Sequence, residues 1–171
     1  MNREVSEVQE TNDLVAMYWC GTTVYRDAHI GNMRTFLLSD LIRRTLQMLG
    51  YRVSIIQNIT DVGHMSEDFE DEDKMLAQSK TENSDPFLVA KRYEARFHTD
   101  LRAFNILPAD VYPKASECIE LMQDLIGQLM SKANAYVGSD GSVYFDAHSS
   151  PEYGLLSGNR LDALKPGYRY E

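Results

Sequence analysis

The feature that most constrains the fold is a strand–helix–strand pattern over residues 14–57. Residues 14–19 form a continuous apolar run with Gly21 close behind, which is typical of a strand buried on both faces. Residues 30–49 carry apolar side chains at helical spacing, and Gly50 is placed to end that helix. Residues 51–57 alternate and are β-branched, which predicts a second strand. Short links of this kind join parallel strands, so the expected fold class is α/β with a parallel sheet.

The same pattern predicts which side of the first helix faces the core. The side chains expected to point inward are Ile30, Met33, Phe36, Leu37, Leu41, Leu46 and Leu49. Those expected to fall mostly between them, on the polar side, are Arg34, Ser39, Asp40, Arg43, Arg44 and Gln47.

Two further amphipathic helices are predicted over about residues 85–104 and 113–132. Asp85 with Pro86 behind it suits a helix start. The side chains expected inward are Phe87, Leu88, Tyr93, Phe97, Leu101 and Phe104 in one helix, and Ile119, Met122, Leu125, Ile126 and Leu129 in the other. Residues 135–145, with glycines in their middle, predict a β-hairpin. Residues 1–13 and the acidic run 66–74 are expected to be a mobile tail and a solvated loop.

Charge and length exclude several classes of protein. The chain has 171 residues and a formal net charge of −9, whereas a chain that grips tRNA alone needs a basic surface to neutralise phosphates. A local basic group lies near the predicted helix and second strand, at Arg34, Arg43, Arg44 and Arg52. No apolar run approaches the roughly 20 residues that span a bilayer, and the start lacks a secretory apolar segment. We therefore expect a cytoplasmic protein with no membrane partner, whose Cys20 and Cys118 are reduced thiols, Cys118 being buried.

The chemistry is concentrated in residues 20–32, between the first strand and the helix. Ligands of open α/β sheets bind at the carboxyl ends of strands, and N–H groups at a helix start suit phosphate. Gly31 leaves room for a nucleotide to approach the backbone, and His29 and Asn32 flank it with donors that could stabilise charge on a phosphate. Taken alone, a histidine beside a glycine at a helix start is more often structural than functional.

The whole string narrows the interpretation. His29-Ile30-Gly31-Asn32 resembles the first signature of class I aminoacyl-tRNA synthetases, usually H-I-G-H. Residues 17–25 resemble the M-Y-x-C-G-P-T-V-Y run of the cysteinyl-tRNA synthetase family, with Thr22 in place of proline. Residues 58–64, 105–108, 141–146 and 153–157 continue the match, so that the resemblance runs over residues 14–168 in one register.

The resemblance implies that ATP, with Mg²⁺ expected, activates cysteine to cysteinyl-AMP. The residues that would hold ATP are His29, Gly31 and Asn32, of which His29 and Asn32 carry the catalytic role. Those that would line the amino-acid pocket are Gly21, Thr23, Thr60 and Asp61, with His64 nearby. On the residues alone, Asp61 and His64 could equally cap a loop. Cys20 would be the first ligand of a zinc ion that prefers a thiolate to a hydroxyl.

The resemblance also implies a Rossmann-type catalytic domain split by an inserted helical module that carries the small hairpin. Residues 14–65 would be the first Rossmann half, and residues 66–171 most of the insertion and a return segment. The family's K-M-S-K-S signature, its remaining zinc ligands, its anticodon-binding domain and its usual N-terminal segment are not found. With Cys20 alone the zinc site is incomplete, because catalytic zinc takes about three protein ligands.

These departures leave three interpretations open. The first is the N-terminal half of a cysteine–tRNA ligase, not competent alone for charging, which meets tRNA only if the missing domains are supplied. The second is a trimmed paralogue that binds nucleotide or aminoacyl-adenylate without charging tRNA. The third is an enzyme repurposed to activate cysteine or another amino acid in a small-molecule pathway. Because half of a doubly wound sheet exposes an edge, we also expect a homo-oligomer or a partner chain that covers it.

Overall fold

The described part of the chain separates into two compact units. The computed structural model describes residues 7–8, 13–63, 74–155 and 157–158. The N-terminal unit is Val8–Ile119, and the C-terminal unit is Glu120–Glu171 with Met1–Glu7. Most of the predicted mobile tail, and all of the predicted acidic loop except Lys74, lie outside the described residues. The family boundary at residue 65 stays a prediction, while the packing places the separation at Ile119.

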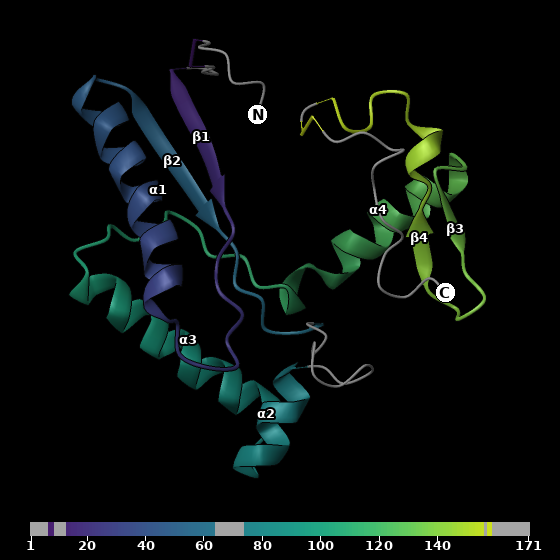
Figure 1. Cartoon of the computed structure of the whole chain (residues 1–171), viewed down its shortest axis with the longest axis horizontal. Helices are drawn as coiled ribbons and strands as arrows, with labels where there is room; N and C mark the ends of the chain where they lie inside the picture. The colour runs from purple at the N-terminus through teal and green to yellow at the C-terminus, as the bar shows by residue number, and fades with distance from the viewer. Residues whose placement is uncertain (1–6, 9–12, 64–73, 156, 159–171) are drawn as a thin grey trace. The chain divides into compact units, whose positions relative to one another are not determined.

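A parallel βαβ unit builds the N-terminal unit, as the sequence pattern predicts (Figure 1). β1 (Leu14–Trp19) pairs with β2 (Arg52–Gln57) in parallel, with Leu14 opposite Arg52 and Trp19 opposite Gln57. α1 (Ile30–Met48) connects the two strands and packs against β2. The prediction that β1 is buried on both faces is wrong for the described chain. Tyr18 is 64% exposed, because the elements of this unit cover only one face of the strand.

A third segment runs beside β2 and shortens the last predicted helix. The amides of Gln57 and Ile59 donate to the carbonyls of Val111 (3.0 Å) and Pro113 (2.9 Å). The amide of Ala115 then donates back to the carbonyl of Ile59 at 3.0 Å. Because residues 111–115 are hydrogen-bonded in an extended arrangement to β2 and to Ile59 just beyond it, they cannot be helical. The helix predicted from residue 113 therefore starts with the 3-10 turn η1 (Ser116–Cys118) and continues as α4 (Ile119–Ser131).

α3 packs its apolar face on α1. α3 (Pro86–Ala103) begins as predicted, with the Asp85 carboxylate accepting the amides of Phe87 (2.9 Å) and Leu88 (3.2 Å). The rings of Phe36 and Phe97 meet edge to face with their centroids 5.2 Å apart. A short helix that the sequence analysis did not predict, α2 (Lys74–Glu82), precedes α3 and packs against it. The buried core is Val24, Met33, Phe36, Ile59, Val89, Ala90, Phe97, Leu101 and Ile106.

The predicted inward faces of the helices are partly wrong. In α1, Ile30 is 73% exposed and Leu41 is 53% exposed, whereas Ser39 and Asp40 are buried. Also exposed are Leu37 in α1, Leu49 directly after it, Phe87 and Leu88 in α3, and Phe104 directly after it. Asp40 is buried because its carboxylate binds Arg44 Nε at 2.6 Å and the Leu107 amide at 3.0 Å, which anchors the chain after α3.

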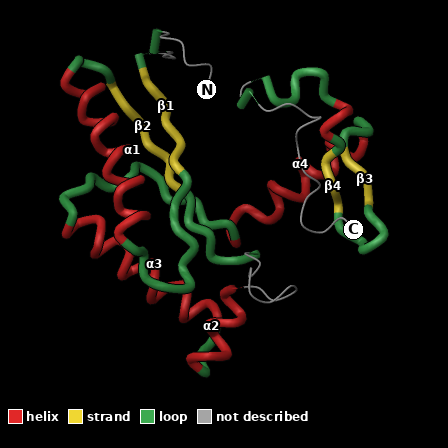
Figure 2. Tube along the Cα trace, in the orientation of Figure 1, coloured by secondary structure: helices red, strands yellow, loops and turns green. Residues whose placement is uncertain are grey.

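The C-terminal unit consists of α4 and a short antiparallel pair (Figure 2). β3 (Ala135–Val137) pairs with β4 (Val143–Phe145) at the residues where the sequence predicts a hairpin, and η2 (Ala147–Ser149) follows. No residue of α4 is buried, so the prediction that its apolar stripe forms core is wrong for the described chain. Cys118, expected buried, is only partly so because it lies in η1 just before this uncovered helix. Among the described residues, no helix combines the length and apolarity needed to cross a membrane.

Candidate functional site

His29 starts α1 and is held there by the backbone that follows it. Its Nδ1 accepts the amides of Gly31 (3.1 Å) and Asn32 (3.3 Å), and the Asn32 side-chain oxygen accepts the His29 amide at 3.1 Å. This reciprocal pair is a capping box, which satisfies donors that a helix start otherwise leaves open. The first amides of α1 are therefore engaged by the imidazole, whereas the sequence analysis expected them to be free for phosphate.

The cap fixes which atoms of His29 and Asn32 remain available. A backbone N–H can only donate, so Nδ1 must be the unprotonated nitrogen, and the proton of the neutral ring lies on Nε2. By the same reasoning the Asn32 oxygen is used, which leaves its Nδ2 hydrogens as donors. Both side chains thus keep donors that the cap does not use.

A small cavity of about 160 Å³ lies at this corner. Its lining residues are Gly21, Thr22, Thr23, Tyr25, Arg26, Asp27, Ala28, His29 and Asn32. Gly31 does not line it. A Cβ on Gly31 would lie 2.9 Å from His29 Cε1, so this glycine makes room for the imidazole. Asp27 is paired with Arg96 at 2.7 Å.

The predicted amino-acid residues meet at the carboxyl ends of β1 and β2. Thr23 and Thr60 form a parallel bridge, and the Thr60 amide donates to the Thr22 carbonyl at 3.0 Å. A Cβ on Gly21 would lie 1.6 Å from the Asn58 carbonyl oxygen, so the two chains touch where no side chain fits. Gly21 and Thr23 thus line the cavity, whereas Thr60 lies beside Thr23 but is not part of its lining, and a shared amino-acid pocket stays a prediction.

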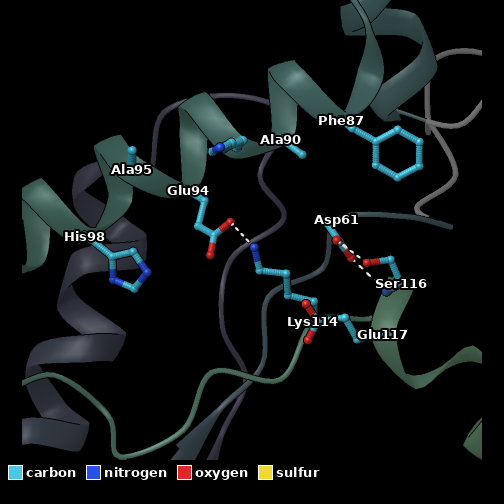
Figure 3. A pocket seen from close by; sticks show the side chains of 10 residues that line it. Asp61, Phe87, Ala90, Glu94, Ala95, His98, Lys114, Ser116 and Glu117 are labelled. Atoms are coloured by element: carbon cyan, nitrogen blue, oxygen red, sulfur yellow. Dashed lines mark hydrogen bonds and ion pairs between the residues drawn. The ribbon is translucent and has the colours of Figure 1, made fainter.

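Asp61 points to a different place. Its buried carboxylate accepts the Ser116 amide at 2.9 Å and the Ser116 hydroxyl at 2.5 Å, so it caps the turn that leads into η1. It lines a second cavity of about 570 Å³ between α3 and residues 114–117, shown in Figure 3. Asp61 is thus not in the lining of the His29 cavity. Its predicted neighbour His64 lies outside the described residues.

Ion pairing and burial set the charges in the second cavity. Lys114 Nζ donates to Glu94 Oε2 at 2.7 Å, and this hydrogen bond raises the pKa of the Lys114 ammonium (Figure 3). Burial lowers the pKa of the His98 imidazole, with the Glu94 carboxylate opposing that shift. The His98 ring packs edge to face on Tyr112, with centroids 4.7 Å apart. Of the charged groups that line this cavity, Lys114 and Glu94 therefore neutralise each other, while Asp61 is satisfied by Ser116.

The predicted zinc ligand stands alone. Cys20 is exposed, and the described residues contain no group of three or more His, Cys, Asp or Glu that could hold a metal ion. Because catalytic zinc takes about three protein ligands, the described residues do not fit a zinc site by themselves.

Asn58 had no predicted role, although residues 58–64 are part of the family resemblance. Its side chain links three residues: it accepts from Tyr18 and Gly21 and donates to Thr60. The signal that could have identified Asn58 is its position directly after the second strand, because the carboxyl ends of parallel strands meet at one edge, where ligands bind.

Comparison with known proteins places the chain among synthetases. Residues 6–171 match the family described as tRNA synthetases class I (C) catalytic domain. The cysteine–tRNA ligase of Deinococcus radiodurans is 44% identical over 168 residues, covering 98% of this chain and 34% of that protein. A cysteine–tRNA ligase of Thermus thermophilus is 42% identical over 158 residues, covering 92% of this chain and 33% of that protein. The chain thus spans about a third of the length of the curated relatives it matches.

Proposed function

This chain belongs to the family of class I (C) tRNA synthetase catalytic domains, and from that membership we propose that it contributes to the ATP-dependent activation of cysteine. In that reaction a carboxylate oxygen of the amino acid attacks the α-phosphorus of ATP. The bond to the pyrophosphate oxygen breaks, and cysteinyl-AMP and pyrophosphate form.

The observation that carries the proposal is the pair of donors at the start of α1. His29 Nε2 and Asn32 Nδ2 keep hydrogens after the capping box has formed, and both residues line the 160 Å³ cavity. Donors held in place before the reaction stabilise charge that grows on a phosphate in the transition state. The capping box holds them, because it uses the opposite atoms of the same two side chains.

The amino acid would lie at the neighbouring strand ends. Gly21 lines the cavity and presents bare backbone, and Thr23 and Thr60 are joined across the two strands. A small side chain such as that of cysteine suits a pocket built from glycine and threonine. Mg²⁺ would be held chiefly by the phosphates of ATP, whose charge it neutralises. No step of the proposal depends on that ion or on zinc.

Transfer to tRNA is proposed only in combination with the portions of the relatives that this chain does not span. Among the described strands, β1 is paired on one side by β2 and on the other by none. An unpaired strand edge is a ready site for further strand pairing. We propose that this edge receives such a portion, a partner chain or a second copy.

The test is amino-acid-dependent exchange of pyrophosphate into ATP, run on this chain alone and on this chain with the remaining part of the Deinococcus relative. His29→Asn is the informative variant, because asparagine caps helices well but has no Nε2 donor. We expect exchange with cysteine, and a loss of about 100-fold or more in His29→Asn at an unchanged melting temperature. His148→Asn, at an exposed histidine of the C-terminal unit, is the matched control and should keep the rate.

Each outcome separates the interpretations. Exchange with a different amino acid would favour a repurposed enzyme. Exchange that survives His29→Asn would contradict the assignment of the donor. No exchange in either preparation, with nucleotide binding retained, would favour a binding module.

A further inference from the structure

The hydrogen bonds around Asn58 have a fixed direction. The Gly21 amide donates to Asn58 Oδ1 at 2.9 Å, and the Tyr18 hydroxyl reaches the same atom at 2.9 Å. A backbone N–H cannot accept, so the oxygen of the Asn58 side chain must face Gly21. Its Nδ2 therefore faces Thr60, and donates to Oγ1 at 3.1 Å.

This direction determines what the Thr60 hydroxyl can do. Oγ1 accepts from Asn58, so its own hydrogen is not used in that bond. No described residue accepts this hydrogen. The backbone of Thr60 is also held on both sides, because its amide donates to Thr22 and its carbonyl accepts from Val24 at 3.2 Å. Thr60 thus presents a hydroxyl donor from a rigid position.

The same network removes a competing donor. The Gly21 amide is bound to Asn58 and is not free for a ligand. A Cβ added to Gly21 would lie 1.6 Å from the Asn58 carbonyl oxygen, so the two backbones pass very close to each other at this point. Among the donors of the Asn58 network, the Thr60 hydroxyl, beside the cavity-lining Thr23, is therefore the one that remains.

We propose that Asn58 is a positioning residue that makes Thr60 a hydrogen-bond donor to an acceptor atom of the bound amino acid. The inference rests on the proposed function, since the ligand is the amino acid of the activation reaction. Asn58 acts through Thr60 and is not itself a ligand contact in this proposal: its Nδ2 donates to the Thr60 hydroxyl oxygen, which directs the hydroxyl hydrogen away from Asn58.

The decisive variant is Asn58→Asp. A carboxylate still accepts from Gly21 and Tyr18, but it cannot donate, so the Thr60 hydroxyl turns its hydrogen to Asp and away from the ligand. Thr60→Val removes the hydroxyl at nearly the same shape. Asn83→Asp, at an exposed residue between α2 and α3 that lines neither cavity, adds the same charge and serves as the control.

The measurement is the affinity of each variant for 5′-O-(N-cysteinylsulfamoyl)adenosine, a stable mimic of the adenylate, by calorimetry. Asn58→Asp and Thr60→Val should each weaken binding by about tenfold, the value of one good hydrogen bond. The double variant should bind as the single variants do, because both changes remove the same interaction. Thr60→Ser should recover most of the affinity lost in Thr60→Val, and Asn83→Asp should bind as the unchanged chain does.

The alanyl analogue of the probe identifies the acceptor atom. If the loss caused by Thr60→Val persists with it, the acceptor is an oxygen of the aminoacyl group. If the loss disappears, the acceptor is the sulfur. Wild-type affinity in Asn58→Asp, or losses that multiply in the double variant, would overturn the inference.

A ligand-free measurement separates this inference from the proposed function. The side-chain amide signal of Asn58 in ¹⁵N–¹H spectra should move in Thr60→Val and return in Thr60→Ser. An unmoved signal would overturn the Asn58–Thr60 coupling. If the signal moves but the unchanged chain binds neither analogue, the proposed function is wrong. The proposed hydrogen bond from Thr60 to the amino acid is then wrong as well, while the coupling of Asn58 to Thr60 stands.

Discussion

Phe97 of α3 and Leu125 of α4 lie on helices whose apolar residues recur with the same period, yet Phe97 is 2% exposed and Leu125 is 57% exposed. The difference extends to the two units that contain them. All buried hydrophobic side chains of the described chain lie between Val15 and Ile106, in the N-terminal unit. Helical spacing shows which side chains share a face. Whether that face is covered depends on elements far away in the sequence.

The largest expected effect tests this difference directly. Phe97→Ala should lower the free energy of unfolding by about 3–5 kcal/mol, because it leaves a cavity against Phe36. Leu125→Ala should change it by no more than about 0.5 kcal/mol, as for other exposed sites. Urea unfolding of the two variants checks both values. Equal losses would mean that the face of α4 is covered in solution.

Two glycines should respond with opposite signs. Gly21→Ala would drive a Cβ into the Asn58 carbonyl and should cost about 1–3 kcal/mol, together with loss of binding to the adenylate mimic. Gly127 in α4 has nothing within 4 Å of an added Cβ, so Gly127→Ala should stabilise by about 0.5–1 kcal/mol through helix propensity. Melting curves of both variants test this, and destabilisation by Gly127→Ala would contradict an open helix face.

Two aspartates, Asp40 in the N-terminal unit and Asp140 in the C-terminal unit, compare the stability contributed by a buried and by an exposed hydrogen-bond acceptor. Asp40→Ala should cost about 2 kcal/mol, because it leaves the Leu107 amide and Arg44 without their buried, charged acceptor. Asp140 accepts from the Tyr144 hydroxyl at 2.7 Å but is fully exposed, so water replaces it readily in Asp140→Ala. Denaturant unfolding should rank the two variants in that order. The reverse ranking would show that Asp40 is not sealed from water.

The smallest expected effect is a difference in the pH range over which each unit loses stability. Burial lowers the pKa of His98, so the folded N-terminal unit favours the neutral ring. This contribution is complete above the ordinary histidine value near 6.5 and is lost as pH falls below it. Hydrogen bonds from Tyr144 and Ser142 lower the pKa of Asp140, so its contribution is lost only below the ordinary value of 3.8.

The measurement is the melting temperature between about pH 7.5 and about pH 5.5, which brackets the ordinary histidine pKa. A small fall is expected, and His98→Gln should flatten it. A fall of equal size in His98→Gln would assign the effect to another group.

Local patterns were sufficient for the elements of the N-terminal unit. β1, α1 and β2 lie within one residue of their predicted limits, because apolar runs, capping residues and Gly50 act over a few positions. The start of α4 was missed because residues 111–115 pair with β2, and no local signal reports a strand partner so far away. α2 was missed because its sequence has no clear apolar stripe.

The candidate site shows the same limit. Gly21, Thr23 and Thr60 were predicted to share a pocket only from the family resemblance; the fold brings Thr23 beside Thr60, because the ends of parallel strands meet at one edge. Asp61 lies beside Thr60 in the sequence, but its carboxylate turns to Ser116, a partner that only the fold brings near. The capping role of His29 was hidden for the opposite reason. It is local, but the motif drew attention to phosphate instead.

The bonds of Ser116 to Asp61 cross 55 positions of the chain, as does the bond of Asp110 to the Ile55 amide. Contacts of such separation form late, since the intervening loop must close before they can contribute. During synthesis, β1, α1 and β2 leave the ribosome well before the segment that borders β2. The backbone and side-chain hydrogen bonds at the ends of the first two strands are therefore incomplete until residues 110–116 have been synthesised. Over that interval a nascent chain offers an open strand edge to chaperones or to neighbouring chains.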